Sequence, residues 1–535
     1  MKKWLLAGMM ALGMIPLYIQ AQEIAVVPYP ETLSVEAGSF GLDRVGVYCG
    51  RSEFMPEATF LCGKLDKLSV QAKTVKKKSK ANLILAYAPD LKVAGAYRLE
   101  VTPRRIIVSA AGREGIFYGV QTLLQLAGKD RTLGCCRIVD APRYAWRGFM
   151  LDEARHFFGK EKVKELLDWM AYFKLNKFHW HLTDETGWRV EIKKYPRLTT
   201  VGGKGNWSEP DGEEARFYTQ EEIREILDYA SARHIEVIPE IDMPGHATAA
   251  NKAYPELSGG GTPEHPDFTF NVGKEEVYAF LTEVLREVAD LFPSSYLHIG
   301  GDEVAYGIKA WETDPHVQGL MRREGMKQVK EAERYFMHRM ADSVRLLGKT
   351  LVGWDELVDL NVPVEGTQIL WWRHDRVNQL KKSLSGGYAT VLCPRRPLYF
   401  DFVQHKTHKW GRVWNGFCPL EDVYAFPDKG MVSWQIPQEQ MKLVKGIQAN
   451  LWTERVQHAE RLDFMTFPRL CALAEAAWTA PEKKDYESFC RRMETVYDRF
   501  DRAGIYYFDA RRPERHPEPE GARQKKRDMP MDFRD

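Results

Sequence analysis

Asp302 and Glu303 are the strongest chemical signal in the sequence, because these adjacent acids directly follow the run His298-Ile-Gly-Gly. The glycines let a ligand approach the backbone closely. Glycosidases that use two carboxyls place them about 5–5.5 Å apart in retaining enzymes and about 6.5–9.5 Å apart in inverting ones. Neighbouring side chains leave a strand in opposite directions, so these two acids cannot easily flank one glycosidic bond. The pair therefore suits a sugar that supplies its own nucleophile, with one acid at the leaving oxygen and the other beneath the ring.

Carboxylates, histidines and tryptophans also follow the other short apolar runs, and the chain holds 15 tryptophans. A sugar pocket needs both kinds of side chain, because carboxylates and arginine bind hydroxyls while indole rings cover the C–H face of the ring. The pattern therefore predicts a carbohydrate pocket built from many strand ends. These residues are Asp152, Arg155, His179, His181, Asp184, Asp242, His246, Trp354, Asp355, Glu356, Trp371, Trp372, Arg373, Tyr399, Asp401, Trp452 and Glu454.

A metal-dependent hydrolase is the first alternative. His179 and His181 have the spacing of a metal-binding pair, and Asp184 and His246 could complete the ligand set. The pair lies on the second strand, however, and the later strand ends offer tryptophan where a metal would need ligands. The sequence therefore predicts no metal and no cofactor, and histidines that pack and hydrogen-bond in the floor of the pocket.

A repeated unit must position these residues, since each short apolar run is followed by a helical stretch. Eight such units favour a (β/α)8 TIM barrel, an α/β fold whose chemistry lies at the carboxyl ends of the strands. A doubly wound parallel sheet is the alternative. Helical spacing occurs at 160–173, 220–232, 275–291 and 331–347. The expected strands are 148–152, 177–181, 235–241, 296–300, 351–354, 368–372, 390–393 and 446–451.

The barrel is expected at 141–505, after a small α+β domain at 22–140 in which two strand-like runs precede a helix. Residues 506–535 are dense in charge and proline, so we expect a disordered tail there. The formal net charge of +2 creates no field that would favour nucleic acid. The lysine-rich stretch 76–80 is expected to be a solvated loop.

Residues 1–21 have the pattern of a signal peptide. Lys2 and Lys3 precede an apolar run at 4–19, and cleavage is expected after Ala21. A retained N-terminal anchor is the alternative. No other apolar run is long, so the mature chain is expected to be exported, to the periplasm, the cell surface or the medium, without a membrane span. The sequence does not indicate an oligomeric state.

The segment Leu297-His-Ile-Gly-Gly-Asp-Glu303 resembles the signature of family 20 glycoside hydrolases, the β-N-acetylhexosaminidases. The first block of the chain resembles the α+β domain that usually precedes the barrel of that family, so the likeness covers nearly the whole mature chain except the tail. Further segments are similar to the family's motifs and occur in the family order. They are Arg147-Gly-Phe-Met-Leu-Asp-Glu-Ala-Arg155, His179-Trp-His-Leu-Thr-Asp184, Pro239-Glu-Ile-Asp-Met-Pro-Gly-His246, Gly353-Trp-Asp-Glu356 and Asn450-Leu-Trp-Thr-Glu454.

The resemblance implies a retaining, substrate-assisted mechanism, in which the carbonyl oxygen of the sugar's 2-acetamide group attacks C1 and forms an oxazolinium-like intermediate. Glu303 would protonate the leaving oxygen and then activate water. Asp302 would accept the acetamide N–H and balance the developing positive charge. Tyr399 would hydrogen-bond the acetamide oxygen.

The resemblance also implies the aromatic walls of the pocket. Trp354 and Trp452 would cover the acetamide and the sugar ring, together with one residue of the pair Trp371 and Trp372. The two side chains of this pair should face opposite ways, and we favour Trp371 as the one that faces the sugar.

Charged side chains would bind the sugar's edge. By the resemblance, Arg155 and Glu454 hold the O3/O4 edge and Asp401 holds the O4/O6 side, while Asp184 and His246 support the acid. Because gripping that edge blocks chain extension, we expect an exo-acting enzyme. Its substrates would be oligosaccharides or glycoconjugates with terminal non-reducing β-linked GlcNAc or GalNAc.

Two alternatives remain open at this point. One is a disaccharide-releasing relative of the same family, which would need a wider pocket. The other is a non-catalytic carbohydrate-binding protein, which would need the pocket but not the acid. The sequence specifies neither the natural glycan nor the preference between GlcNAc and GalNAc.

Overall fold

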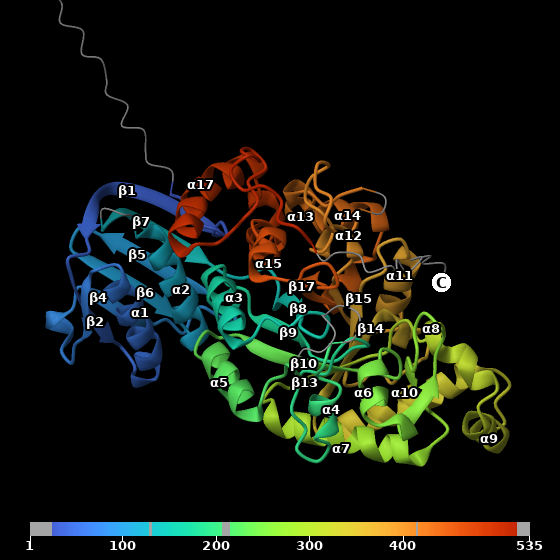
Figure 1. The fold of residues 1–535 in the computed structure, drawn as a ribbon. Helices are drawn as coiled ribbons and strands as arrows, with labels where there is room; N and C mark the ends of the chain where they lie inside the picture. The colour runs from blue at the N-terminus through green and yellow to red at the C-terminus, as the bar shows by residue number, and fades with distance from the viewer. Residues whose placement is uncertain (1–23, 128–130, 206–213, 414–415, 522–535) are drawn as a thin grey trace, which may run out of the picture.

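The computed structural model describes residues 24–127, 131–205, 214–413 and 416–521. These residues form an N-terminal sheet domain and a closed barrel, joined by a long C-terminal helix (Figure 1). The expected signal peptide at 1–21 lies outside the described residues. Within the described ranges, no helix has both the length and the apolar character needed to cross a membrane.

The N-terminal domain is a seven-stranded sheet with two helices packed on it. Its strands are β1 (Thr32–Gly41), β2 (Arg44–Cys49), β3 (Gln71–Thr74), β4 (Leu83–Tyr87), β5 (Tyr97–Thr102), β6 (Arg105–Ala110) and β7 (Thr132–Asp140). The spatial order is β1-β7-β5-β6-β4-β2-β3. In β5, Tyr97, Leu99 and Val101 are buried and alternate with more exposed residues, which is the pattern of a sheet with one covered face. The helices are α1 (Met55–Lys67) and α2 (Arg113–Leu126).

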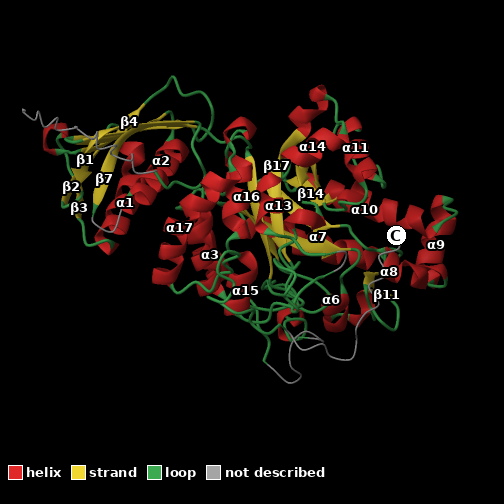
Figure 2. Cartoon of the chain, turned by 90° about the horizontal axis from the view of Figure 1, so that it is seen from above, coloured by secondary structure: helices red, strands yellow, loops and turns green. Residues whose placement is uncertain are grey.

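Eight parallel strands close into a barrel, which confirms the predicted fold and excludes the open doubly wound sheet. They are β8 (Trp146–Asp152), β9 (Lys177–His181), β10 (Glu236–Met243), β13 (Tyr296–Gly300), β14 (Thr350–Trp354), β15 (Thr367–Trp371), β16 (Ala389–Leu392) and β17 (Val444–Leu451). Each predicted strand lies within two residues of the observed one at both ends. Figure 2 shows these strands at the centre of a surrounding layer of helices.

The helices that follow the first strands agree with the predicted helical stretches. They are α3 (Lys160–Tyr172), α5 (Gln220–Ser231), α7 (Glu275–Leu291) and α10 (Val329–Leu346). Helix α5 shows why a helix forms at these positions. Thr219 and Glu222 form a capping box at its start, and Ile223, Ile226 and Leu227 are buried on one face. Loops and short helices follow the carboxyl ends of the strands.

A buried polar cluster joins the two domains at the end of β7. The carboxylate of Asp140 accepts hydrogen bonds from Tyr97 (2.6 Å) and from the indole of Trp478 (2.9 Å). The Lys174 ammonium lies 3.1 Å from the same carboxylate, and both side chains are fully buried. Because each charge is paired and hydrogen-bonded, the cluster can lie between two apolar cores.

The C-terminal region differs from the predicted tail. Helix α17 (Tyr486–Ala503) packs on both domains, and Arg499 donates to the carbonyl oxygen of Gln125 at 2.9 Å. After it, Tyr507 and Phe508 are buried, and the chain is described as far as residue 521. The expectation of a disordered tail from 506 is therefore wrong for 506–521, because aromatic residues anchor a segment whose overall composition is charged. Residues 522–535 lie outside the described residues.

Candidate active site

The carboxyl ends of the barrel strands surround one pocket. Seven of the residues predicted to form the site line this pocket. They are Arg155, His246, Asp302, Glu303, Tyr399, Trp452 and Glu454. Trp354, Asp184 and Asp401 lie buried directly behind this lining. The lining residues are Arg155, Glu185, His246, His265, Asp302, Glu303, Tyr306, Trp372, Arg395, Tyr399, Arg412, Trp452 and Glu454.

A strained turn presents the two adjacent acids to the pocket. Gly300 and Gly301 have φ angles of +66° and +93°, and Glu303 has a φ angle of +51°. A Cβ atom at Gly300 would lie 1.7 Å from Asp242 Oδ1, so only glycine fits there. A non-glycine residue in the left-handed region costs about 1–2 kcal/mol. Strain of this kind is typical of functional turns, and here it directs the Glu303 side chain into the pocket.

Asp302 is a buried carboxylate with an open acceptor position. Burial raises the pKa of Asp302 to about 7, with the His246 imidazole opposing this shift and Glu303 adding to it. Among the described residues, none hydrogen-bonds Asp302 Oδ1. Beside it, burial and the Asp302 charge raise the pKa of Asp242 well above its usual range. Asp302 therefore lies beside a neutral acid and can itself change between its protonated and ionised forms near neutral pH.

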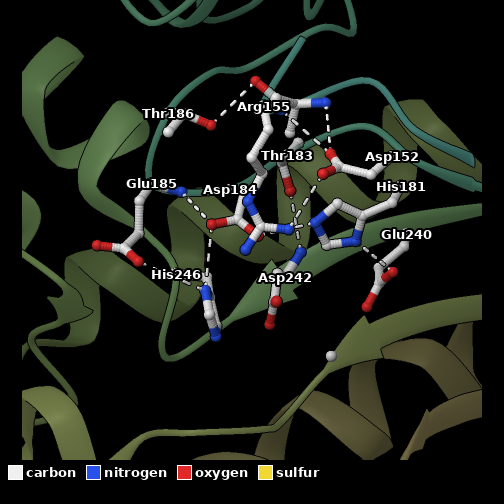
Figure 3. A network of polar contacts seen from close by, with 12 residues as sticks. Asp152, Arg155, His181, Thr183, Asp184, Glu185, Thr186, Glu240, Asp242 and His246 are labelled. Carbon is white, nitrogen blue, oxygen red and sulfur yellow. Dashed lines mark hydrogen bonds and ion pairs between the residues drawn. The ribbon is translucent and has the colours of Figure 1, made fainter. Parts of the chain in front are cut away.

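His246 links the acids of the pocket to a buried network (Figure 3). Its Nδ1 donates to Asp184 Oδ1 at 3.1 Å, and its Nε2 lies 3.5 Å from Glu303 Oε2 and 3.6 Å from Asp302 Oδ2. Burial opposes the charged imidazole, but the Asp184 and Asp302 carboxylates raise the pKa of His246 well above its usual value. The imidazolium form therefore places a positive charge between the network and the two pocket acids.

Asp184 is the centre of that network. It accepts from His246, from His181 Nε2 at 2.9 Å and from Arg155 Nη2 at 2.7 Å. Burial alone would raise its pKa, but Arg155 and His246 hold the pKa of Asp184 well below its usual range. A permanently ionised Asp184 fixes His246 on one side and Arg155 on the other, so a single carboxylate orients two groups that line the pocket.

Glu240 lies one layer deeper, in the floor of the barrel. Its carboxylate contacts His181 Nδ1, and it lies 2.9 Å from His179 Nε2 and 2.9 Å from His298 Nδ1. It also accepts the indole N–H of Trp354 at 2.9 Å. Glu240 therefore connects an aromatic wall of the pocket to the chain of groups that ends at Asp184, and the predicted packing role of the histidines agrees with these contacts.

The metal alternative named His179, His181, Asp184 and His246, but among the described residues no group of metal-ligand atoms contains both His179 and His181. Asp242, His246 and Asp302 bring ligand-type atoms within 4.8 Å of one another, as do His179, Glu240 and His298. The second set is already paired internally through Glu240. In the first set, His246 donates to Asp184 and Asp302 is the open acceptor. The His246 imidazolium is therefore a cation that lies beside Asp302 and is fixed by its hydrogen bond to Asp184.

Aromatic rings form the opposite wall. Trp354, Trp372, Tyr399 and Trp452 belong to one buried cluster inside the barrel. Trp372 and Tyr399 stack with ring centroids 6.4 Å apart and planes within 12°. Burial raises the pKa of Tyr399 well above its usual value, so its hydroxyl remains a hydrogen-bond donor at neutral pH. This wall offers flat apolar faces and one donor to a bound sugar.

The expectation that Trp371 faces the sugar is corrected by the structure. Trp371 is fully buried in the outer core and packs against Trp434 with centroids 5.2 Å apart. Strand register explains this outcome, because Leu370 pairs with the inward-facing Trp354. Leu370 and Trp372 therefore face inward and Trp371 faces outward.

A cluster of charges lies at one end of the pocket. Arg155 stacks over Trp452, with its guanidinium carbon 5.0 Å from the ring centroid. Arg412 contacts the Asp401 carboxylate through Nε and lies 2.8 Å from Glu454 Oε1 through Nη2. Burial raises the pKa of Asp401 to about 6, against the opposing charge of Arg412. The predicted edge-binding residues are thus together, held by an arginine that the sequence did not reveal.

Five pocket residues were missed by the sequence reading, namely Glu185, His265, Tyr306, Arg395 and Arg412. None of them lies at the end of an apolar run, and the site was predicted from the residues at those ends. The aromatic-rich connection before β17 was one usable signal, since it contains Arg395 and Arg412. Tyr306 follows Glu303 on the short helix α8 (Ala305–Ile308) and stacks on His265 with centroids 5.0 Å apart.

Comparison with known proteins agrees with this geometry. The family model described as "Glycosyl hydrolase family 20, catalytic domain" matches residues 144–481, and the model for domain 2 of that family matches residues 23–141. A beta-hexosaminidase of Porphyromonas gingivalis is 37% identical over 90% of this chain, which spans 64% of that protein's length. A beta-N-acetylhexosaminidase of Cellulomonas fimi is 31% identical over 90% of this chain and 95% of its own.

Solved structures superpose over most of this chain. The GH20 exo beta-N-acetylglucosaminidase of Vibrio harveyi in complex with N-acetylglucosamine superposes with a TM-score of 0.83. It is 33% identical and the match covers 91% of this chain and 78% of that one. The N-acetyl-beta-hexosaminidase of Streptomyces plicatus has a TM-score of 0.79 at 30% identity, over 93% and 98% of the two chains.

Proposed function

Because the chain belongs to glycosyl hydrolase family 20, we propose that it is an exo-acting β-N-acetylhexosaminidase with a retaining, substrate-assisted mechanism. Its substrates are glycans with terminal β-linked GlcNAc or GalNAc. The names of similar proteins, which include an exo beta-N-acetylglucosaminidase, support this class of substrate. The observation that carries the proposal is the buried, open carboxylate oxygen of Asp302 beside Glu303 in an aromatic-walled pocket.

Asp302 has the environment needed to favour an intermediate over the substrate. The acetamide N–H of a bound sugar would satisfy Asp302 Oδ1, and the acetamide oxygen would then be directed at C1. A carboxylate whose pKa is about 7 gains little from a neutral amide and much more from the cation that forms on ring closure. The interaction therefore strengthens along the reaction, as transition-state stabilisation requires.

Glu303 has the position of the proton donor. It lies at the pocket, with a side chain that is 17% exposed, and its carboxylate is 3.5 Å from His246. Once Glu303 has protonated the leaving oxygen, the His246 imidazolium stabilises the resulting carboxylate. The same carboxylate then accepts a proton from the attacking water, which completes the retaining cycle.

The charged end of the pocket supports exo action. Arg155, Asp401, Arg412 and Glu454 meet there and would grip the hydroxyls of the non-reducing sugar. A disaccharide-releasing enzyme needs space for a further sugar at that end. The charged cluster occupies this position, so release of single sugars is the better fit.

Substitution of the proposed acid tests this function. Glu303→Gln is expected to lower kcat on an unactivated β-GlcNAc glycoside, such as the β-linked disaccharide of GlcNAc, by about 10²–10⁴-fold, the range for loss of a general acid. Its thermal unfolding and its affinity for GlcNAc should remain close to those of the wild type. Wild-type turnover by the variant would remove Glu303 from this role. A folded wild-type protein that binds GlcNAc but cleaves no β-GlcNAc glycoside would instead be a binding protein.

A further inference from the structure

We propose that Glu518, in the C-terminal segment 516–521, is a positioning residue that fixes the loop carrying Arg412 into the sugar pocket. The inference rests on the proposed function, because it assigns a role in gripping the non-reducing sugar. It concerns a part of the chain that is far from the pocket in sequence and whose composition predicted disorder.

The carboxylate of Glu518 clamps the backbone of the loop. Its Oε2 accepts the N–H of Lys409 at 2.6 Å and its Oε1 accepts the N–H of Trp410 at 2.8 Å. The Glu518 side chain is only 11% exposed, and Arg461 Nη1 lies 3.5 Å from the same carboxylate. Two charge-assisted hydrogen bonds to consecutive amides leave this stretch of backbone little freedom.

The segment around Glu518 is itself anchored. The fully buried Arg461 donates from Nη1 to the carbonyl oxygen of Pro519 at 2.7 Å. The carbonyl oxygen of Glu520 lies 3.1 Å from His458 Nε2. A Cβ atom at Gly521 would lie 2.9 Å from Trp410 Cβ, so the segment also packs directly on the loop. Glu518 therefore holds the loop against a fixed support.

The clamped backbone leads directly to Arg412. Its amide donates to the carbonyl oxygen of Asp401 at 2.9 Å, and its carbonyl oxygen accepts the N–H of Val403 at 3.1 Å. From this backbone position the guanidinium reaches both Asp401 and Glu454. Only Gly411 thus separates the backbone clamped by Glu518 from a side chain that bridges two acids of the pocket.

Arg412 matters because it keeps two like charges compatible. Asp401 and Glu454 would repel each other if the guanidinium moved away, and the negative charge of Glu454 already raises the pKa of Asp401. A protonated or displaced Asp401 binds a sugar hydroxyl less well. Loosening the loop should therefore weaken binding at the O4/O6 side, while the acid and the acetamide site stay in place.

Kinetics of Glu518→Ala tests the inference. We expect KM for p-nitrophenyl β-GlcNAc to rise about tenfold, the equivalent of one charge-assisted hydrogen bond, with kcat changed far less. For the 6-deoxy analogue, which lacks a hydroxyl on that side, the same variant should change KM much less. Glu518→Gln keeps one acceptor oxygen, so its KM for p-nitrophenyl β-GlcNAc should lie between those of the wild type and Glu518→Ala. Glu520→Ala, which changes an exposed side chain of the same segment, should match the wild type.

A double-mutant cycle separates positioning from general stability. If Glu518 acts through Arg412, then Glu518→Ala combined with Arg412→Ala should be no worse in KM than Arg412→Ala alone. Additive losses, or an equal loss on the 6-deoxy analogue, would overturn the inference. Hydrogen exchange of residues 403–412 should also quicken in Glu518→Ala, and unchanged exchange would count against it. This readout does not depend on turnover, so failure of the proposed function would be seen separately, as an inactive wild type.

Discussion

Single residues in the pocket acquire different protonation states from their surroundings. The pKa of Asp184 is held low by Arg155 and His246 despite burial, whereas burial raises the pKa of Asp242 well above its usual range. Asp302 lies between these extremes, with a pKa of about 7. Three acids close to one histidine thus provide a fixed anion, a neutral acid and an adjustable anion, and such separation is how one site supports several roles.

The raised pKa of Asp302 predicts a pH-dependent gain in stability for Asp302→Asn. The folded protein keeps this proton up to about pH 7, while an unfolded aspartate releases it near its model value of 3.8. Ionisation therefore costs the wild type stability as the pH rises through this window, and the asparagine variant avoids that cost. Relative to wild type, the variant should gain roughly 2–4 kcal/mol of unfolding free energy between pH 4 and pH 8.

Denaturant unfolding at a series of pH values measures this difference. The same variant should lose most of its activity, because an amide cannot balance the positive charge of the intermediate. A stability difference that is independent of pH would show that Asp302 ionises in the folded protein as it does in the unfolded chain.

At the scale of elements, alternation and register decide which side chains reach the pocket. The apolar runs were sufficient to predict all eight barrel strands, and their ends placed Asp302, Glu303 and Tyr399 at the pocket. They could not determine which face of a strand turns inward, because both Trp371 and Trp372 are apolar and aromatic. Only pairing with the neighbouring strand settles that choice, and pairing is not encoded within a single strand.

The two tryptophans form a matched pair for a test of this register. Trp372→Ala should lower kcat/KM on β-GlcNAc substrates by about 10- to 100-fold, because a wall of the pocket is lost. Trp371→Ala should leave KM unchanged and instead lower the unfolding free energy by about 3–5 kcal/mol, since it empties a core position. Steady-state kinetics and denaturant unfolding of both variants measure the contrast. The reverse assignment of effects would mean that Trp371 faces the sugar.

Loops were the least predictable elements. Arg412 and Arg395 lie in a long connection without periodicity, and their place in the pocket depends on contacts made far along the chain. Residues 506–521 were expected to be disordered because their average composition is polar. Tyr507, Phe508 and Glu518 nevertheless make specific contacts, and an average over a window cannot represent single anchoring residues.

At the scale of the whole molecule, the sheet domain and the C-terminal helix are held to the barrel by specific contacts. The joint is polar and buried, with Asp140 and Lys174 both fully inaccessible to solvent. Removing one partner of such a pair strongly destabilises the fold, because the remaining charge stays buried without its partner. This pairing could not be predicted from the sequence, since its members lie 34 residues apart and in different domains.

Lys174→Met should therefore destabilise the protein without altering its chemistry. We expect a loss of about 3–5 kcal/mol in unfolding free energy, because the Asp140 carboxylate loses its counter-charge. At temperatures where the variant is folded, kcat/KM should equal that of the wild type. Denaturant unfolding followed by tryptophan fluorescence measures the first quantity. A variant as stable as the wild type would show that the domain joint does not depend on this ion pair.

The central claim is that the substrate's own acetamide group attacks the anomeric carbon. Its most direct test is kcat/KM for p-nitrophenyl glycosides of glucosamine whose N-acyl group is acetyl, fluoroacetyl, difluoroacetyl or trifluoroacetyl. Fluorine withdraws electrons from the carbonyl oxygen, so an attacking acetamide predicts a rate that falls steeply with each added fluorine, by well over about tenfold across the series. A rate that is insensitive to fluorination would contradict the account.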